Sequence, residues 1–150
     1  MHEPCQKGVC VQDLMTPHPV AVPPQESLGT VWKTMAERRF RHMPVVDEAG
    51  QLVGLISQRD LLAAARARDG KLEFADDRPA ESVMRAPVDS VAPTCCAAEA
   101  ARYMLRTKRS CLPVVDEAGV LVGILTEADY LRMATREAPR CTCGGVAPGH

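Results

Sequence analysis

Apolar side chains recur along the chain at regular spacings. Spacings of three and four residues predict an amphipathic helix, and the first such positions are Leu28, Val31, Trp32, Met35 and Ala36. A second predicted helix has the same spacing with smaller side chains, at Ala97, Ala100, Ala101, Met104 and Leu105. The chain therefore contains the same helix pattern twice.

Two short apolar runs follow the first predicted helix. Residues 44–46 and 52–56 are expected to form strands, and residues 47–50 form a turn whose final glycine is free to adopt a positive φ. A second helix is predicted over 61–68, and a glycine two residues later ends it. With a short strand at 20–22, the unit is β-α-β-β-α.

The chain consists of two copies of this unit. Pro44–Gly50 recurs letter for letter as Pro113–Gly119, and the offset of 69 positions holds without a gap over a long stretch. The expected organisation is an N-terminal tail at 1–10, a first unit at 11–69, a linker at 70–79, a second unit at 80–138 and a C-terminal tail at 139–150. One unit alone leaves an apolar sheet face uncovered, so we expect an α+β fold with the units packed sheet to sheet about a pseudo-twofold axis. Such an axis creates two related clefts, where small ligands bind.

Composition narrows the class of protein. The 150 residues are 46% apolar and carry a formal net charge of −1, so no global field favours nucleic acid or an acidic membrane surface. The longest apolar runs fall short of the roughly 20 residues that a membrane-spanning helix needs, and the N-terminus has no apolar signal core. We therefore expect a cytoplasmic protein whose seven cysteines are reduced or hold metal.

The sequence carries no motif for catalysis. Glu99, Glu127 and Asp129 are carboxylates near predicted helix starts, but their spacing does not pair them for acid–base chemistry. Neither a glycine-rich phosphate loop nor a nucleophile elbow occurs in the sequence. A non-catalytic protein is therefore expected.

Four short motifs occur in the same order in both copies. In the first copy they are Leu14–Pro17, Val22–Pro24, Met43–Asp47 and Gly54–Asp60. In the second copy they are Val83–Met84, Val91–Pro93, Leu112–Asp116 and Gly123–Asp129. Together they resemble a tandem pair of CBS domains (the cystathionine-β-synthase type), called a Bateman module. The resemblance covers most of the chain. It implies a stand-alone regulatory homodimer that binds AMP, ADP, ATP, NAD or S-adenosylmethionine and acts as an energy or metabolite sensor for a protein client.

The resemblance also implies a role for two aspartates. In family members the Gly-x-x-Ser/Thr-x-x-Asp motif places its carboxylate on the ribose hydroxyls, and Asp60 and Asp129 are the matching residues. Two carboxylate oxygens can accept both donors of a ribose diol. The residues alone equally fit a helix-capping box, with Ser57 or Thr126 as the capping hydroxyl. The two roles are compatible.

In related modules each cleft combines residues of both copies, and AMP or ATP is the expected ligand. By that resemblance, site one contains Val20, Ala21, Val22, Arg41, His42, Met43, Thr126 and Asp129. Site two contains Ser57, Arg59, Asp60, Asp89, Ser90, Val91, Ser110, Cys111 and Leu112. For His42, packing beside the strand is the alternative role.

Charge distinguishes the two expected sites. Arg41 is the expected phosphate contact of site one, whereas Ser110 and Cys111 are the neutral counterparts in site two. A phosphorylated ligand should therefore bind site one more tightly. In site two the expected cation is Arg59, with Lys108–Arg109 as further candidates.

Four cysteines lie outside the two motif-bearing units, at Cys5, Cys10, Cys141 and Cys143. Four thiolates could form a closed tetrahedral zinc site, although these spacings differ from the paired Cys-x-x-Cys of zinc ribbons. The alternative is exposed reduced thiols on flexible tails. Two other functions therefore stay open beside ligand sensing: a ligand-free scaffold or interaction module, and a thiol or metal sensor that uses these cysteines.

The expected homodimer needs an apolar surface. Two apolar stripes could supply it, at 61–65 and 130–134. Packing against their own sheet would use the same side chains, so both alternatives stay open.

Overall fold

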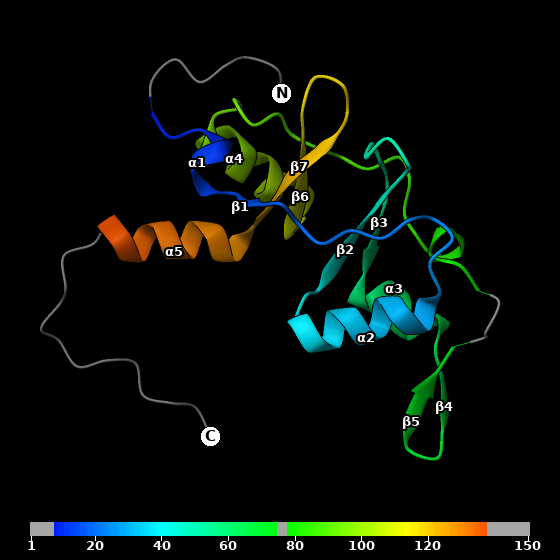
Figure 1. The fold of residues 1–150 in the computed structure, drawn as a ribbon. Coiled ribbons are helices and arrows are strands. Elements are labelled where there is room, and N and C mark those ends of the chain that lie inside the picture. The colour runs from blue at the N-terminus through cyan, green and yellow to red at the C-terminus, as the bar shows by residue number, and fades with distance from the viewer. Residues whose placement is uncertain (1–7, 75–77, 138–150) are drawn as a thin grey trace, which may run out of the picture.

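Both repeats fold into the same set of elements in the computed structural model, which describes residues 8–74 and 78–137 (Figure 1). The first repeat contains α2 (Leu28–Arg38), β2 (His42–Val46), β3 (Leu52–Ser57) and α3 (Gln58–Ala64). The second contains α4 (Ala97–Thr107), β6 (Cys111–Val115), β7 (Leu121–Thr126) and α5 (Glu127–Glu137). Before these come α1 (Val11–Leu14) with β1 (Thr16–Pro17), and the 3-10 turn η1 (Ala80–Ser82). The predicted α+β fold is confirmed.

The predicted apolar stripes supply the buried faces of α2 and α4, except that the last residue of each stripe, Ala36 or Leu105, is exposed. In α2, Leu28, Val31 and Met35 are buried. The equivalent buried residues of α4 are Ala97, Ala100 and Met104. Ser27 caps the N-terminus of α2, and its Oγ accepts a hydrogen bond from the Thr30 N–H at 3.2 Å. Within the part of the chain that the structure describes, no helix is long and apolar enough to cross a bilayer.

The turn between β2 and β3 forms as predicted. Its first residue, Asp47, accepts hydrogen bonds on Oδ1 from the backbone N–H groups of Ala49 (3.0 Å) and Gln51 (2.9 Å). Gly50 has a φ of 80°, which a glycine adopts without strain. Strands β2 and β3 then pair antiparallel, and β6 and β7 repeat the arrangement.

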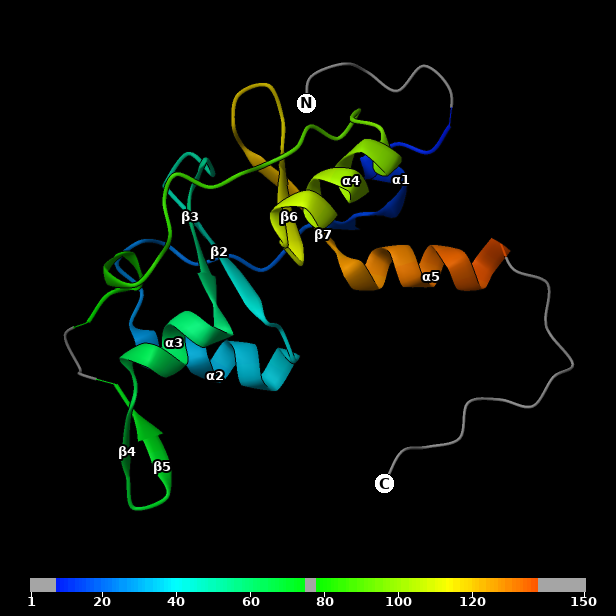
Figure 2. The same ribbon diagram turned by 180° about the vertical axis from the view of Figure 1, so that it is seen from behind.

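The two turns also join the repeats to each other. The Leu52 N–H donates to the Gly119 carbonyl at 3.1 Å, and the equivalent Leu121 N–H donates to the Gly50 carbonyl at 3.0 Å. These reciprocal bonds relate the two strand pairs by the predicted pseudo-twofold axis. Figure 2 shows the two strand pairs side by side.

The segment that leads into each repeat lies on the other repeat. We call residues 8–17 and 78–85 the first and second leading segments. In the first, β1 pairs antiparallel with β7 of the second repeat. In the second, Arg85 forms a bridge with Leu55 of β3, through hydrogen bonds of 2.9 and 3.1 Å. Each sheet is therefore completed by chain from the other repeat.

The leading segments also complete the two hydrophobic cores. Val11 is buried in the core of the second repeat, and Ala80 is buried in the core of the first. Two methionines of the leading segments lie against glycines of the opposite sheet, Met84 on Gly54 and Met15 on Gly123. A Cβ on either glycine would overlap the methionine, so a larger residue does not fit.

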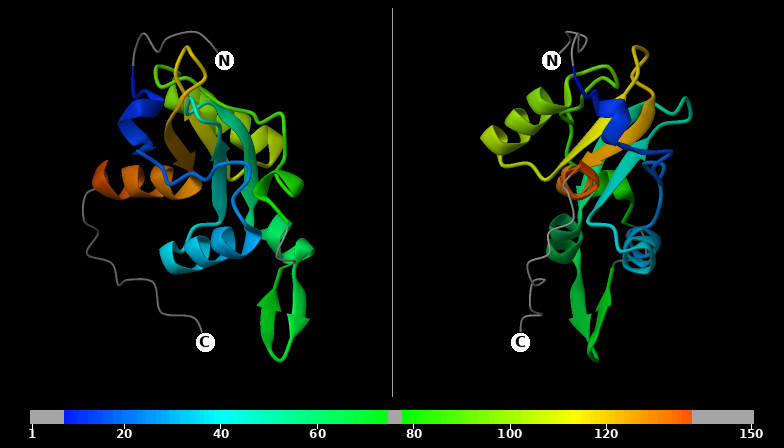
Figure 3. Two further views of the ribbon diagram at one scale, coloured as in Figure 1. Left: turned by 45° about the vertical axis from the view of Figure 1, so that its right-hand side comes forward. Right: turned by 90° about the vertical axis from the view of Figure 1, so that its left-hand side faces the viewer.

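The predicted helix at 61–68 is wrong in its second half. Helix α3 ends at Ala64, and the chain continues as a hairpin of β4 (Arg66–Arg68) and β5 (Lys71–Glu73), which extends away from the rest of the fold (Figure 3). The turn residues Asp69–Gly70 both have positive φ, 51° and 74°. That conformation suits a two-residue hairpin turn, so this part of the polar connection is ordered as strands.

The predicted strand at 20–22 is reduced to one bridge. Val22 pairs in parallel with Val45 of β2, and its N–H donates to the Pro44 carbonyl at 3.1 Å. Pro23–Pro24 follows directly, and proline has no N–H with which to continue a ladder.

Candidate functional site

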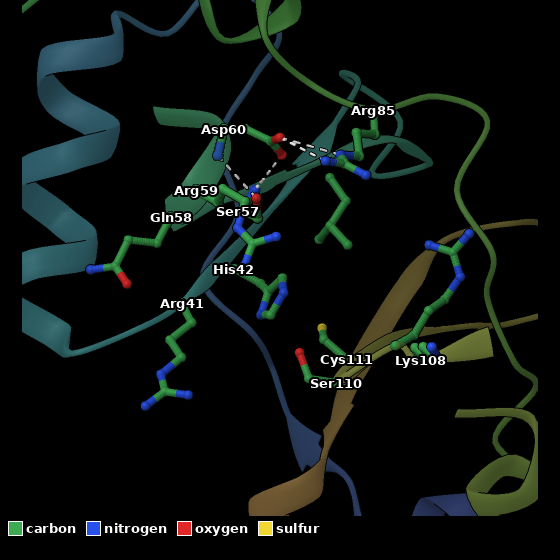
Figure 4. Close-up of a pocket in the computed structure, with 12 residues that line it drawn as sticks. Arg41, His42, Ser57, Gln58, Arg59, Asp60, Arg85, Lys108, Ser110 and Cys111 are labelled. Carbon is green, nitrogen blue, oxygen red and sulfur yellow. Dashed lines mark hydrogen bonds and ion pairs between the residues drawn. The ribbon is translucent and has the colours of Figure 1, made fainter. Parts of the chain in front are cut away.

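A cavity of about 490 Å³ opens between the two repeats (Figure 4). The residues that line it are Arg41, His42, Leu55, Ser57, Gln58, Arg59, Asp60, Arg85, Lys108, Arg109, Ser110 and Cys111. Five of them were expected at site two, namely Ser57, Arg59, Asp60, Ser110 and Cys111, and its further candidates Lys108 and Arg109 also line the cavity. Arg41 and His42, which were expected at site one, lie in the same cavity. We call this cavity the Asp60 cleft.

Asp60 lies at the start of α3. The Ser57 N–H donates to Asp60 Oδ2 at 3.0 Å, and the Asp60 N–H donates to Ser57 Oγ at 3.1 Å, so the capping box forms in full. From across the cleft, Arg85 donates to Asp60 Oδ1 through Nε (3.2 Å) and Nη2 (3.1 Å), as Figure 4 shows. Burial opposes ionisation, but the hydrogen bonds from Ser57 and the Arg85 cation outweigh it and hold the pKa of Asp60 below its ordinary value. With its side chain 13% exposed, Asp60 presents an ionised carboxylate to the cleft.

Asp129, the equivalent residue of the second repeat, is enclosed instead. The Thr126 N–H (2.8 Å) and hydroxyl (3.2 Å) both donate to Asp129 Oδ2. Asp129 Oδ1 accepts from the Thr16 hydroxyl at 3.3 Å and forms an ion pair with Arg132. The side chain is only 2% exposed. Asp129 lines a different cavity, of about 310 Å³, whose other lining residues are Gly8, Val9, Asp13, Leu14, Arg132, Met133 and Arg136.

Cations outnumber carboxylates around the Asp60 cleft. The cationic lining residues are Arg41, Arg59, Arg85, Lys108 and Arg109. Among the described lining residues, Asp60 is the one carboxylate that faces them. A cleft lined mainly by one sign of charge focuses the field and concentrates ligands of the opposite sign. The arrangement therefore favours an anionic ligand.

Asp89, expected to line site two, contacts the cleft through another residue. Arg109 Nε lies 2.8 Å from Asp89 Oδ2, and the Tyr103 hydroxyl donates to the same oxygen at 2.6 Å. The hydrogen bond to Asp89 raises the pKa of Tyr103, so the hydroxyl keeps its proton and the bond persists at neutral pH. Asp89 thus orients Arg109, which lines the cleft.

Two lining residues, His42 and Cys111, are held uncharged. Burial lowers the pKa of His42; Asp60 opposes the change and Arg41 adds to it, so the ring is neutral at pH 7. Burial raises the pKa of Cys111 to about 12, and Asp129 contributes to the rise. The Cys111 thiol therefore stays protonated and does not act as a nucleophile.

The other residues of the two predicted sites lie away from the cleft. Four are buried in the hydrophobic cores, namely Val22, Met43, Val91 and Leu112. Val20 packs against the first core, and Ser90 is half-buried. Ala21 lines a separate cavity beside residues 46–49. The structure thus distributes the residues of predicted site one over several cavities.

Arg85 was missed from the sequence. The offset of 69 positions makes Arg85 the equivalent of Thr16, and the two side chains have little chemistry in common. The position of Arg85 follows from the exchange of leading segments, which no local pattern encodes. The repeat offset, which pairs Arg85 with Thr16, was the one sequence signal that could have linked Arg85 to a hydrogen bond with an aspartate.

The predicted zinc site at Cys5, Cys10, Cys141 and Cys143 falls mostly outside the described residues. Cys10 lies at the start of α1 and is half-buried. The other three cysteines lie outside 8–74 and 78–137. Within those ranges, no group of three or more His, Cys, Asp or Glu side chains is arranged to hold a metal ion. The zinc site stays a prediction.

A protein-family model matches this chain and identifies its family. The model of the CBS domain matches residues 11–67 and, a second time, residues 80–135. The chain belongs to the CBS domain family. The resemblance of its motifs to a tandem CBS pair is thereby confirmed.

Three relatives of this CBS pair bear on its function. It is 34% identical to the homoserine O-acetyltransferase of Methanococcoides burtonii over 82% of its own length and 24% of that protein. The crystal structure of CBSX2 of Arabidopsis thaliana in complex with AMP has 31% identity and a TM-score of 0.74, with 86% of this chain and 98% of that one covered. The CBS domain pair of MJ0100 in complex with 5′-methylthioadenosine and S-adenosyl-L-methionine has 27% identity and a TM-score of 0.73, with 87% and 98% covered. This chain spans about a quarter of the length of several curated enzymes that it matches.

Proposed function

We propose that this CBS pair is a regulatory, non-catalytic module that binds an anionic adenosine ligand, AMP or ATP, in the Asp60 cleft. The observation that carries the proposal is the ionised Asp60 carboxylate beside five cationic side chains. The complex of CBSX2 with AMP supports it, because that protein has a closely similar fold. The cleft volume of about 490 Å³ lies within the usual range for small-ligand pockets.

The ribose and the phosphates of a nucleotide both have partners in this cleft. The ribose diol donates to Asp60, whose oxygens have lone pairs beyond those used by Ser57 and Arg85. The phosphates lie among the cations, where charge-assisted hydrogen bonds form. S-adenosylmethionine has a sulfonium cation and no phosphate, so the same cations disfavour it. The ligand of the MJ0100 pair is therefore a poorer match than a nucleotide.

One ligand per chain is expected. Both aspartates have both oxygens hydrogen-bonded, but the Asp129 side chain is only 2% exposed, against 13% for Asp60. Thr16 and Arg132 contact Asp129 Oδ1, and the Thr126 N–H and hydroxyl contact Oδ2. A ribose would have to displace these partners before it could bind. Asp60 accepts a ligand by losing its contact with one arginine, Arg85, whose side chain is largely exposed.

Calorimetric titration of AMP, ATP, NAD and S-adenosylmethionine tests the proposal. Wild type is expected to bind AMP and ATP at one site per chain and S-adenosylmethionine more weakly than either. Asp60→Asn should weaken AMP binding about tenfold or more, since a charged acceptor is lost, whereas the matched control Asp129→Asn should leave it nearly unchanged. Absence of binding by all four ligands to folded wild type would overturn the proposal in favour of a ligand-free scaffold. An effect confined to Asp129→Asn would overturn the choice of cleft.

We also propose that the protein is a homodimer. One part of the predicted apolar stripes packs inside the chain, because Leu61 is fully buried in the first core. Another part faces outward: Leu62 of α3 is 47% exposed, and the equivalent Leu131 of α5 is 68% exposed. These two leucines are related by the repeat offset, so a second chain could cover both with one symmetric surface. A dimer would let a ligand in the cleft influence a client protein through the association of the chains.

A further inference from the structure

Cys10 and Cys96 lie opposite each other where the first leading segment crosses the start of α4. The two residues form an antiparallel bridge. The hydrogen bonds on either side of it run from the Val11 N–H to the Cys95 carbonyl (2.8 Å) and from the Ala97 N–H to the Val9 carbonyl (2.9 Å). Cys10 and Cys96 are therefore a non-hydrogen-bonded pair, in which the Cα atoms of facing residues are about 4.5 Å apart. A disulfide spans Cα separations of about 4.4–6.8 Å, so this pair can be bridged with little movement of the backbone.

The other half of the molecule shows that the crossing does not need cysteines. At the equivalent place, Ser27 and Pro79 form the same antiparallel bridge. The hydrogen bonds beside it are also the same, from the Leu28 N–H to the Arg78 carbonyl (3.2 Å) and from the Ala80 N–H to the Glu26 carbonyl (2.7 Å). Two thiols at one bridge are therefore an addition to this crossing and not a requirement of the fold.

Exposure distinguishes this pair from the neighbouring cysteine. Cys10 and Cys96 are both partly exposed, whereas Cys95 is buried in the second core. Burial also raises the pKa of Cys95, which disfavours its thiolate. An oxidant in solution can thus reach Cys10 and Cys96 but not Cys95.

We propose that Cys10 and Cys96 are a redox site that forms an intramolecular disulfide with a small oxidised thiol such as oxidised glutathione. The thiolate of one cysteine attacks the glutathione disulfide, which releases one reduced glutathione and leaves a mixed disulfide. The thiolate of the second cysteine attacks the protein sulfur of that mixed disulfide and releases the second glutathione. Two protein thiols are oxidised, and one glutathione disulfide is reduced to two thiols.

The bond would fasten the first leading segment to the second repeat. This segment carries Thr16, whose hydroxyl donates to Asp129. The disulfide joins residues 86 positions apart in the chain, so it also restricts the unfolded chain. We therefore expect the oxidised protein to unfold at a higher temperature than the reduced protein. The disulfide and the rise in unfolding temperature are independent of nucleotide binding.

The test uses the full chain with Cys5→Ser, Cys141→Ser and Cys143→Ser, so that the terminal thiols do not interfere. After treatment with oxidised glutathione, tryptic digestion without reductant should yield residues 8–33 linked to residues 86–102, from a chain that stays monomeric in a denaturing non-reducing gel. Adding Cys95→Ser should preserve the link and the rise in unfolding temperature. Adding Cys10→Ser or Cys96→Ser should remove both. A link that survives Cys96→Ser, or glutathione adducts without any link, would overturn the proposal.

Discussion

Arg85 and Thr16 occupy equivalent positions of the two repeats, and each donates a hydrogen bond to the aspartate that begins the last helix of the other repeat. Arg85 Nη2 lies 3.1 Å from Asp60 Oδ1, and Thr16 Oγ1 lies 3.3 Å from Asp129 Oδ1. The threonine is short and neutral and helps to enclose its aspartate. The arginine is charged and largely exposed, so it can leave Asp60 for a ligand and still stay at the cleft. This one difference accounts for much of the asymmetry between the surroundings of Asp60 and those of Asp129.

Arg85→Gln is expected to weaken ATP binding about fivefold and to change adenosine binding little. The loss corresponds to about 1 kcal/mol, the upper value for a partly exposed charge pair, and adenosine lacks the phosphates that the arginine would contact. Titrations of ATP and adenosine into the same variant measure the difference. Thr16→Val is the matched control and should leave ATP affinity unchanged. Equal losses for both ligands would contradict a phosphate contact.

Gly54→Ala is expected to destabilise the protein by about 1–3 kcal/mol, because the new Cβ overlaps Met84 in the second leading segment. Urea unfolding followed by the fluorescence of Trp32 measures the change. Gly29→Ala is the control, since a Cβ there meets no atom within 4 Å; its unfolding free energy should stay within about 1 kcal/mol of wild type. The double variant Gly54→Ala with Met84→Ala should lose less than the sum of the single variants, and strict additivity would exclude the overlap.

The stability of the protein should fall as pH decreases through the ordinary pKa of histidine. The pKa of His42 is lowered in the folded chain by burial, so near pH 6.5 the unfolded chain binds a proton that the folded chain does not. The stability that the neutral His42 ring contributes is present above the pKa of histidine in the unfolded chain. It is lost as the pH falls through the lower pKa of His42 in the folded chain. Denaturant unfolding between pH 8 and pH 5 should show a smaller loss for His42→Gln than for wild type. Identical profiles for His42→Gln and wild type would refute the assignment.

Cys111 is expected to resist alkylation in the folded protein at pH 8. Its pKa, raised to about 12 by burial, leaves almost no thiolate at that pH. Mass spectrometry of tryptic residues 110–132 after treatment with iodoacetamide reports labelling of this residue. Rapid labelling should begin only in denaturant. Labelling of Cys111 as fast as that of Cys10 under native conditions would be inconsistent with its burial.

Leu131→Glu is expected to convert the proposed dimer to a monomer, because it places a charge in an apolar interface. Sedimentation velocity over a range of protein concentrations measures the change, and Leu62→Glu should have the same effect. Leu105→Glu is the control: Leu105 is 80% exposed on α4, outside the proposed interface, and this variant should associate like wild type. A monomeric wild type, or equal dissociation by all three variants, would reject the interface.

The repetition of the sequence made the main elements predictable. Equal spacing of apolar side chains in both copies indicated α2 and α4, and the Asp-Glu-Ala-Gly strings indicated the two turns. The end of α3 could not be foreseen, because Ala63–Ala65 and Arg66 are good helix formers and the chain leaves the helix only to form the β4–β5 hairpin. That outcome depends on a turn at Asp69–Gly70, whose glycine is also typical of a helix stop.

The site was harder to predict than the fold. The capping box of Ser57 and Asp60 depends on neighbours in sequence, and local reasoning was sufficient for it. The joint presence of Arg41 and Asp60 in one cleft depends on how the repeats face each other, and the contact of Arg85 depends on the exchanged leading segment. The enclosure of Asp129 depends on Thr16, which is 113 positions away in the chain. Such long-range relationships require the tertiary structure.

Because the two repeats are joined in one chain, their equivalent positions are free to diverge. Two separate copies of a single repeat, paired about a true twofold axis, would have two identical clefts, and any substitution would alter both at once. Covalent linkage removes that restraint. A mutation at codon 16 then changes only the surroundings of the enclosed Asp129, and a mutation at codon 85 changes only those of the open Asp60. Selection can therefore act on each half of the molecule separately.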